Sequence, residues 1–325
     1  MPVLYWLVAM THRKPLPRLL AATLGLGLPV LPWIAAPAIG RTLQVGADQA
    51  YKAPSAAIAA AHDGDVVDVA PGQYYDCAVI TQNNLTVQGT GPGAVLTDKT
   101  CQGKALLVID GANITIRNLT LQRARVPDQN GAGIRAEGGN LTIENSRFIN
   151  DQNGILGADN PQAVIHVSGS TFEDNGICGG SCSHAIYVGH FKLLRVDHSH
   201  FMRTHDGHSI KSRASRTEVI DNDIADGPDG TSSYLIDIPN GGSALIDGNR
   251  LEKGPRTGNP ANAIMIGEEG VDQPTDSLIV RDNHFTNDQA RSTTFVNNIT
   301  ATPVQLSGNV FQGQVRPLAG DGLPR

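Results

Sequence analysis

The chain is poor in charged and aromatic residues. Asp, Glu, Lys and Arg make up 17% of its 325 residues, and Phe, Trp and Tyr make up 5%. Long helical bundles and coiled coils are rich in charged helix formers, so this composition argues against them. Glycine is abundant instead, at 36 residues, which suits many short strands joined by tight turns.

The first 38 residues are typical of a secretory signal peptide. A basic segment at 13–18, an apolar stretch at 19–35 and a small-residue cleavage motif at 36–38 follow one another in the required order. The alternative is a retained membrane anchor, which two prolines in the apolar stretch disfavour. Either Met1 or Met10 could be the start. We expect a periplasmic or secreted protein with a main domain over residues 41–315 and a flexible tail over 316–325.

Removal of this segment would take away three basic residues and no acidic ones, which changes the formal charge from −6 to −9. The mean field of such a chain repels polyanions, so a polyanionic ligand would need a local basic patch. Four cysteines remain, and they agree with export. Cys77 and Cys101 lie 24 residues apart, and Cys178 and Cys182 bracket a short Gly-rich loop, so we expect two local disulfides.

A self-similar pattern of short segments recurs through most of the chain. Each segment alternates apolar and polar residues, passes through a polar turn and ends on a large apolar residue. These terminal residues are Phe148, Phe172, Phe201, Ile224, Leu251, Phe285 and Phe311, at spacings of 24, 29, 23, 27, 34 and 26. Period-2 alternation indicates strands, and a repeat of this length indicates the coils of a solenoid. The sequence therefore predicts an all-β, single-stranded, right-handed parallel β-helix.

Stacked coils place equivalent residues above one another, about 4.8 Å apart. We expect the aligned phenylalanines to form an interior stack. The turns contain asparagines that are expected to form a hydrogen-bonded ladder, namely Asn145, Asn222, Asn249, Asn283 and Asn309.

Residues 53–75 are predicted to form the N-terminal end of the domain. An Ala-rich segment, expected to be a short capping helix, precedes an Asp-Gly-Asp turn, an apolar strand and a Pro-Gly-x-Tyr motif. With these features the chain resembles the pectate lyase superfamily of β-helix proteins, over roughly residues 45–315. The resemblance implies the fold. It also implies a sheet that carries Lys, Arg, His and Tyr in polysaccharide lyases and epimerases, often with calcium.

A second column of strands is aligned on a shared isoleucine, at Ile134, Ile155, Ile186, Ile210, Ile236 and Ile264. If these isoleucines point inward, the residues that follow them point outward. The outward column is then Arg135, Leu156, Tyr187, Lys211, Asp237 and Met265, and Arg213 lies two residues beyond Lys211. Reactive residue types therefore concentrate on three successive coils.

Histidine is concentrated in the same region, with six of the ten histidines between residues 184 and 208. His184 and His208 share one aligned position, where they are either cleft residues or a buried, stacked pair. His205 and Asp206 lie in the turn before the Lys211 strand, and Tyr234 begins the next coil. The candidate substrate-binding residues are Asp237, Tyr234, His184, Arg135, His205 and Asp206.

These residues suit chemistry on an anionic, uronic-acid polysaccharide. β-Elimination and C5-epimerisation both begin by removing the proton next to the carboxylate, which needs a base and a cation to stabilise the developing charge. We predict that Lys211 is the base, with its pKa lowered by Arg213, and that Arg213 holds the carboxylate. Either Tyr187 or Tyr234 would protonate the leaving oxygen or the opposite face of the sugar. His208 is a rival base. An ion pair between Lys211 and Asp237 is the structural alternative.

Two other functions stay open. Inverting hydrolysis needs two carboxyl groups about 6.5–9.5 Å apart, and Asp237 with Glu268 or Asp206 is the available pair. A non-catalytic carbohydrate-binding or structural β-helix would be expected to show aromatic platforms, in which this chain is poor. We expect a monomer without nucleic-acid or membrane partners after cleavage. No cofactor is implied by the residues themselves, although calcium remains possible from the resemblance.

Overall fold

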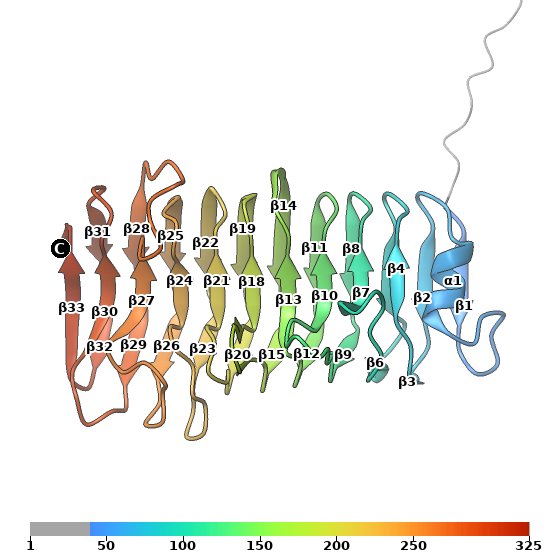
Figure 1. Cartoon of the computed structure of the whole chain (residues 1–325), viewed down its shortest axis with the longest axis horizontal. Coiled ribbons are helices and arrows are strands. Elements are labelled where there is room, and N and C mark those ends of the chain that lie inside the picture. Colours follow the sequence, from blue (N-terminus) through green and yellow to red (C-terminus); the bar gives the residue numbers. More distant parts are fainter. Residues whose placement is uncertain (1–39, 325) are drawn as a thin grey trace, which may run out of the picture. The chain divides into compact units, whose positions relative to one another are not determined.

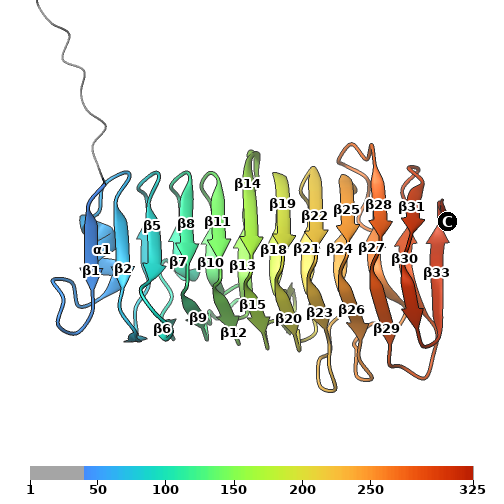
Figure 2. The same cartoon turned by 180° about the vertical axis from the view of Figure 1, so that it is seen from behind.

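Short alternating segments form three parallel sheets that wind around one interior (Figures 1 and 2). The computed structural model describes residues 40–324, so the predicted signal peptide and the alternative membrane anchor lie outside the described residues. Each coil contributes one strand to each sheet, and every pairing between coils is parallel. The predicted all-β parallel β-helix is therefore confirmed.

Sheets A, B and C contain 12, 10 and 10 strands. Sheet A consists of β1 (Thr42–Val45), β2 (Val66–Val69), β5 (Thr86–Gly89), β8 (Ile114–Arg117), β11 (Leu141–Glu144), β14 (Asn160–Ser168), β19 (Phe191–Asp197), β22 (Arg216–Ile220), β25 (Ser243–Asp247), β28 (Leu278–Arg281), β31 (Val304–Ser307) and β34 (Gly322–Pro324). Sheet B consists of β3 (Gly72–Tyr74), β6 (Ala94–Thr97), β9 (Thr120–Gln122), β12 (Arg147–Ile149), β15 (Thr171–Glu173), β20 (His200–Met202), β23 (Asp223–Ala225), β26 (Arg250–Lys253), β29 (His284–Asn287) and β32 (Val310–Gln312). Sheet C consists of β4 (Ala78–Ile80), β7 (Ala105–Ile109), β10 (Ala132–Ala136), β13 (Asn153–Gly157), β18 (Ile186–Val188), β21 (Ile210–Ser212), β24 (Ile236–Ile238), β27 (Asn262–Ile266), β30 (Thr293–Asn298) and β33 (Val315–Gly320).

The two predicted interior columns are confirmed, strand by strand. On sheet B the seven terminal residues from Phe148 to Phe311 pair directly with one another. On sheet C the six isoleucines from Ile134 to Ile264 do the same, and all six are fully buried. The Phe172 ring stacks between two neighbouring phenylalanines at centroid distances of 4.7 and 4.6 Å.

The turns between sheets A and B are held by a ladder of side-chain hydrogen bonds. The backbone N–H of Asn222 donates to Asn249 Oδ1 at 2.9 Å, and that of Asn249 donates to Asn283 Oδ1 at 2.9 Å. Asn145 was wrongly placed in this ladder. It lies one residue earlier, in the left-handed region with φ of 48°, and Ser146 takes the ladder position in its coil.

Helix α1 (Pro54–Ala60) lies at the N-terminal end of the stack, where the Ala-rich segment was predicted to be helical (Figure 1). It buries Ala57 and Ile58 and contacts β1, β2 and β4. That it serves as a cap stays a prediction. The disulfide between Cys77 and Cys101 connects neighbouring coils, as expected.

The second predicted disulfide, between Cys178 and Cys182, also forms. It closes a small hairpin of β16 (Ile177–Cys178) and β17 (Cys182–Ser183), which is inserted ahead of the sheet C strand of that coil.

The β-helix extends beyond residue 315, so the prediction of a flexible tail over 316–325 is wrong for most of its length. Strand β33 pairs with β30 and β34 pairs with β31, which together add a further partial coil. No helix within residues 40–324 is long and apolar enough to cross a membrane.

Candidate active site

The outward column predicted for sheet C is confirmed in register. Arg135, Leu156, Tyr187, Lys211, Asp237 and Met265 pair in that order across adjacent strands. An outward position would normally be exposed, yet Lys211 is 7% exposed and Asp237 is fully buried. Residues from outside the column therefore cover its centre.

The covering residues come from the loop over residues 267–277, between β27 and β28. Glu269 Oε1 accepts a hydrogen bond from Lys211 Nζ at 2.6 Å, and Lys211 Nζ lies 3.3 Å from Asp237 Oδ2. Burial lowers the pKa of Lys211, but these two carboxylates outweigh it and the net shift is upward. The expectation that Arg213 lowers this pKa enough to make Lys211 a base is therefore wrong. Lys211 is an ammonium ion held between two carboxyl groups, as the ion-pair alternative required.

Asp237 is an ionisable group in an unusual setting. Both of its carboxylate oxygens are buried and accept no hydrogen bond from the described residues. Burial raises the pKa of Asp237 to about 7, because the lysine offsets only part of the cost of removing the carboxylate from water. With no exposed surface, Asp237 does not reach a ligand in this arrangement, which contradicts its predicted role in substrate binding.

Arg213 follows β21 and reaches toward Tyr187 on the neighbouring strand. Its Nε donates to Tyr187 Oη at 2.9 Å, and its two terminal nitrogens donate to Asn240 Oδ1 and Glu269 Oε2. The guanidinium and the Lys211 ammonium both lie over the Tyr187 ring, at 5.6 and 5.7 Å from its centroid. These contacts raise the pKa of Arg213 against the effect of its burial. Two cations and one phenol thus meet on adjacent strands.

The two aligned histidines are not cleft residues but form the buried, stacked pair that was the other possibility. The His184 and His208 rings lie 4.7 Å apart, and Tyr234 stacks on His208 at 5.0 Å. His184 Nδ1 accepts from the backbone N–H of His208 at 2.9 Å, and His208 Nδ1 accepts from that of Tyr234 at 3.0 Å. Burial lowers the pKa of His184 to about 3 and that of His208 well below its usual value. Both rings are therefore neutral and carry their proton on Nε2.

This tautomer excludes His208 as the base, because neither ring nitrogen has a free lone pair. It also bears on metal binding. His208, Asp237 and Glu268 each bring a possible ligand atom to within 4.8 Å of the others. His208 Nε2, which lies 3.5 Å from Asp237 Oδ2, would have to lose its proton to ligate a metal. The Lys211 ammonium already lies beside Asp237, and Tyr234 Oη donates to Glu268 Oε2 at 2.8 Å. The cluster therefore fits neither a divalent transition metal nor calcium, which needs six to eight oxygen ligands.

An open groove of about 480 Å³ runs along sheet C beside these residues. Its lining is mostly polar and includes Arg135, Tyr187, Arg213 and Asn240. Arg135 lies two strands from Tyr187, about 10 Å along the stack, and its Nε donates to Glu137 at 3.1 Å. A phenol and two guanidinium groups therefore line this groove.

Several predicted residues lie apart from this groove or below its surface. His205 pairs with Asp174 at 3.4 Å and Asp206 accepts from Thr231 at 3.1 Å, so both stabilise turns. His184 is 4% exposed, which contradicts a substrate-binding role. Tyr234 is half-buried and is engaged with Glu268.

Two members of the site were missed in the sequence, Glu269 and Asn240. Neither belongs to the periodic column, because both lie in loops that follow sheet C strands. The spacing of 34 between Leu251 and Phe285, longer than the others, was the available signal for an inserted loop.

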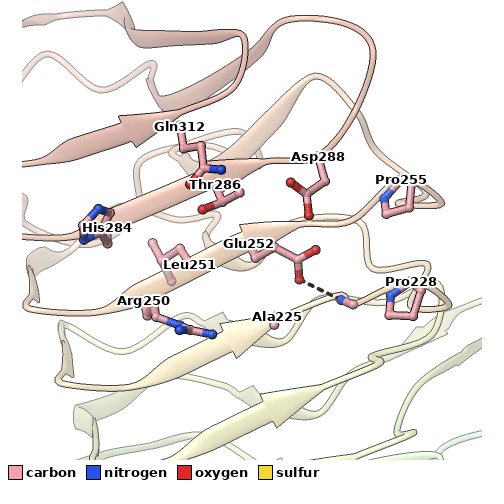
Figure 3. Close-up of a pocket in the computed structure, with 11 residues that line it drawn as sticks. Ala225, Pro228, Arg250, Leu251, Glu252, Pro255, His284, Thr286, Asp288 and Gln312 are labelled. Carbon is pink, nitrogen blue, oxygen red and sulfur yellow. Dashed lines mark hydrogen bonds between the residues drawn. The ribbon is translucent and has the colours of Figure 1, made fainter.

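A second hollow, of about 680 Å³, lies on sheet B near the C-terminal end (Figure 3). Glu252 and Asp288 both project into it, and Glu252 accepts from the backbone N–H of Gly227 at 2.7 Å. Burial and nearby carboxyl groups raise the pKa of Glu252. This hollow contains acidic residues but lacks the two cations and the phenol that lie together on sheet C. We therefore take the groove on sheet C as the candidate active site.

No family model and no curated protein matches the chain. The chain has distant likenesses among solved structures. A pectin methylesterase from Aspergillus niger is 10% identical, with a TM-score of 0.42 over 88% of this chain and 92% of that one. The PL6 family alginate lyase AlyGC is 18% identical, with a TM-score of 0.47 over 88% of this chain and 39% of that one. An alginate lyase from a Paenibacillus species is 17% identical, with a TM-score of 0.40 over 85% and 99% of the two chains.

The parallel β-helix of this chain is shown by its own strand pairing, and its resemblance to the pectate lyase superfamily stays an expectation from the sequence. At such identities and TM-scores, no activity or residue role is carried over to this chain. The candidate site itself holds one phenol, Tyr187, beside two cations, Lys211 and Arg213.

Proposed function

We propose that the chain is an exported enzyme that acts on a uronic-acid polysaccharide by removing the proton next to the carboxylate, as a lyase or a C5-epimerase. The observation that carries the proposal is the contact of 2.9 Å between Arg213 Nε and Tyr187 Oη, in a groove open to a long ligand. This contact between a guanidinium and a phenol supports the proposal, because the chemistry needs a carboxylate-binding group beside a proton-transfer group.

The first requirement of this chemistry is stabilisation of the charge that develops on the uronate. Arg213 and Lys211 supply two positive charges at one point of the sheet, and guanidinium groups bind carboxylates in a planar, two-bond geometry. Arg135, farther along the groove, would bind another carboxylate of the same polymer. Each coil advances about 4.8 Å, so Arg135 is offset from Tyr187 by about 10 Å along the stack.

The second requirement is a group that moves the proton, and Tyr187 replaces Lys211 in this role. In elimination, Tyr187 Oη takes the proton from C5, the bond from C4 to the bridging oxygen breaks, and a double bond forms between C4 and C5. The departing oxygen then takes the proton back from Tyr187. Arg213 Nε would hold the negative charge on Oη while the proton is on the sugar. In epimerisation, Tyr187 keeps the proton that it removed, a proton from solvent adds to C5 from the opposite face, and the bond from C4 to the bridging oxygen stays intact.

Inverting hydrolysis gains no support from this geometry. One carboxylate oxygen of Asp237 and one of Glu268 lie within 4.8 Å of each other, closer than the separation of about 6.5–9.5 Å that leaves room for water. Asp237 is also fully buried, so a sugar would not contact it.

The test is an activity screen with alginate, pectate, glucuronan and a heparin-type chain. An unsaturated product that absorbs ultraviolet light identifies a lyase, and solvent deuterium at C5 without cleavage identifies an epimerase. New reducing ends without unsaturation would contradict the proposal in favour of hydrolysis. Binding without any product would contradict it in favour of a carbohydrate-binding protein.

Variants of Tyr187 and Arg213 test whether these residues carry out the reaction. Tyr187→Phe should lower kcat by about 10²–10⁴-fold, the usual contribution of a general acid or base. Arg213→Lys keeps the charge but removes the planar fork, and it should raise KM as well as lower kcat. Tyr75→Phe is the matched control, because Tyr75 is 65% exposed and lies outside the groove. Full activity in Tyr187→Phe would exclude the proposed role of the phenol.

A further inference from the structure

The Glu269 carboxylate occupies a distinctive position in the candidate site. One oxygen accepts from Lys211 Nζ and the other from an Arg213 terminal nitrogen. A single carboxylate therefore spans both cations that the proposed chemistry needs, while its own side chain remains 39% exposed. These are the contacts that the carboxylate of a uronic acid would need to make.

The backbone and the side chain of this residue are held differently. The Glu269 N–H donates to the Pro239 carbonyl at 2.9 Å, and those of Asp272 and Gln273 donate to the Asn240 carbonyl at 3.0 Å. These bonds fix the loop against the preceding coil. The Glu269 carboxylate has no other partner among the described residues than the two cations, so a side-chain rotation alone would free both of them.

We propose that Glu269 fills the carboxylate subsite of the groove in the absence of substrate and is displaced by the carboxylate of the uronic acid that is to react. The inference rests on the proposed function for the identity of the ligand. The two cations remain paired at every stage, first with the glutamate and then with the sugar.

This exchange makes Glu269 a specificity-determining residue. A neutral sugar or a methyl-esterified uronate cannot replace a charged, two-bond contact to Lys211 and Arg213, because Arg213 would then lose its anionic partner and Lys211 would keep only Asp237. Only an ionised carboxylate of the ligand restores the charged contacts to Lys211 and Arg213 that are lost when Glu269 is displaced. The lysine and the arginine hold the pKa of Glu269 below its usual value despite burial, so the residue stays charged near neutral pH.

The inference is tested by calorimetric titration of the full chain with a sodium oligogalacturonate and a sodium oligomannuronate. Glu269→Gln removes the competing charge and keeps the size of the side chain. It should bind the oligomer about tenfold or more tightly, because a hydrogen bond to a charged group contributes about 1.5–3 kcal/mol. The ratio of the affinities of Glu269→Gln for the charged and the methyl-esterified oligomer should be smaller than that of the wild type, since either ligand can displace a neutral amide more easily than a carboxylate.

Glu218→Gln is the matched control. Glu218 also spans two cations, with contacts of 3.0 Å to Arg195 and 2.6 Å to Arg216, but it lies on sheet A. This variant should leave oligomer binding unchanged. Unchanged or weaker binding in Glu269→Gln, with the thermal midpoint preserved, would overturn the inference and make Glu269 a structural clamp.

The outcomes separate the two proposals. Elimination or epimerisation with no effect of Glu269→Gln on binding or KM would retain the function and reject the displacement. Tighter oligomer binding by Glu269→Gln in a chain that forms no product from any polymer would retain the displacement and reject the function.

Discussion

The buried carboxyl group of Asp237 predicts a specific dependence of stability on pH. Its pKa is raised from 3.8 to about 7, chiefly by burial. Between these two values the folded state retains a proton that the unfolded state has released. Folding is therefore favoured at low pH by this group, and that contribution is lost as the pH rises toward 7. The shift of about three pKa units, at 1.36 kcal/mol each, sets a ceiling of about 4 kcal/mol.

Replacement of Asp237 by Asn removes this titration and keeps the shape of the side chain. Asn still offers an oxygen to His208 Nε2, and Lys211 keeps its contact of 2.6 Å with Glu269. We expect the free energy of unfolding of Asp237→Asn, minus that of the wild type, to rise by about 3 kcal/mol between pH 5 and pH 8. The depressed pKa values of the two buried histidines destabilise both proteins as the pH falls, so their effect cancels to first order.

Urea unfolding at a series of pH values measures this difference, with the disulfides intact. Infrared difference spectra provide a direct reading, because a protonated carboxyl band near pH 6 should be absent from Asp237→Asn. Lys211→Met is a second check. Lys211 lowers the pKa of Asp237, so its removal should shift the titration above pH 7. A difference that is flat with pH, or one that falls as the pH rises, would refute the reasoning.

Three further predictions concern the solenoid. Phe172→Ala should destabilise the fold by about 3–5 kcal/mol in urea unfolding, since the ring is fully buried between two others; a loss below about 1 kcal/mol would contradict the stack. Replacing Cys77 and Cys101 by Ser should cost about 3 kcal/mol, measured against the oxidised protein. Asn249→Ala should cost about 1–3 kcal/mol by leaving the Asn222 N–H unpaired, whereas Asn145→Ala should spare that ladder bond, with hydrogen exchange at Asn222 as the readout.

The interior of the β-helix could be predicted from the sequence because stacking repeats the same environment in every coil. An isoleucine in one strand lies against the isoleucine of the next, so the spacing alone identifies the column. The parity of a strand then fixes which residues point outward, and this placed Tyr187, Lys211 and Asp237 side by side correctly. The prediction for Asn145 failed by one residue, because Ser and Asn serve equally well as acceptors in the turn ladder.

The charge state of the site could not be predicted in the same way. The sequence showed Arg213 two residues from Lys211, which suggests a lowered lysine pKa. It did not show that Glu269, 58 residues away, would contact Lys211. A pKa depends on every charge within a few ångströms, and the loops that supply those charges have no period to align. The tautomers of His184 and His208 likewise depend on backbone N–H groups of the next coil.

The acidic character of the whole chain gives the Glu269 contact its significance. The formal charge of −6 repels a polyuronate on average, so binding depends on local cations. On the candidate face the cations Lys211 and Arg213 are already paired with Glu269, and Lys211 also lies beside Asp237. An anionic polymer would therefore gain little from long-range attraction. It would have to replace the contact of Glu269 with the two cations by an equivalent contact of its own carboxylate. Such an exchange favours discrimination between charged and esterified sugars over tight binding, so the affinity of the wild type should depend only weakly on salt, and that of Glu269→Gln should depend on it more strongly.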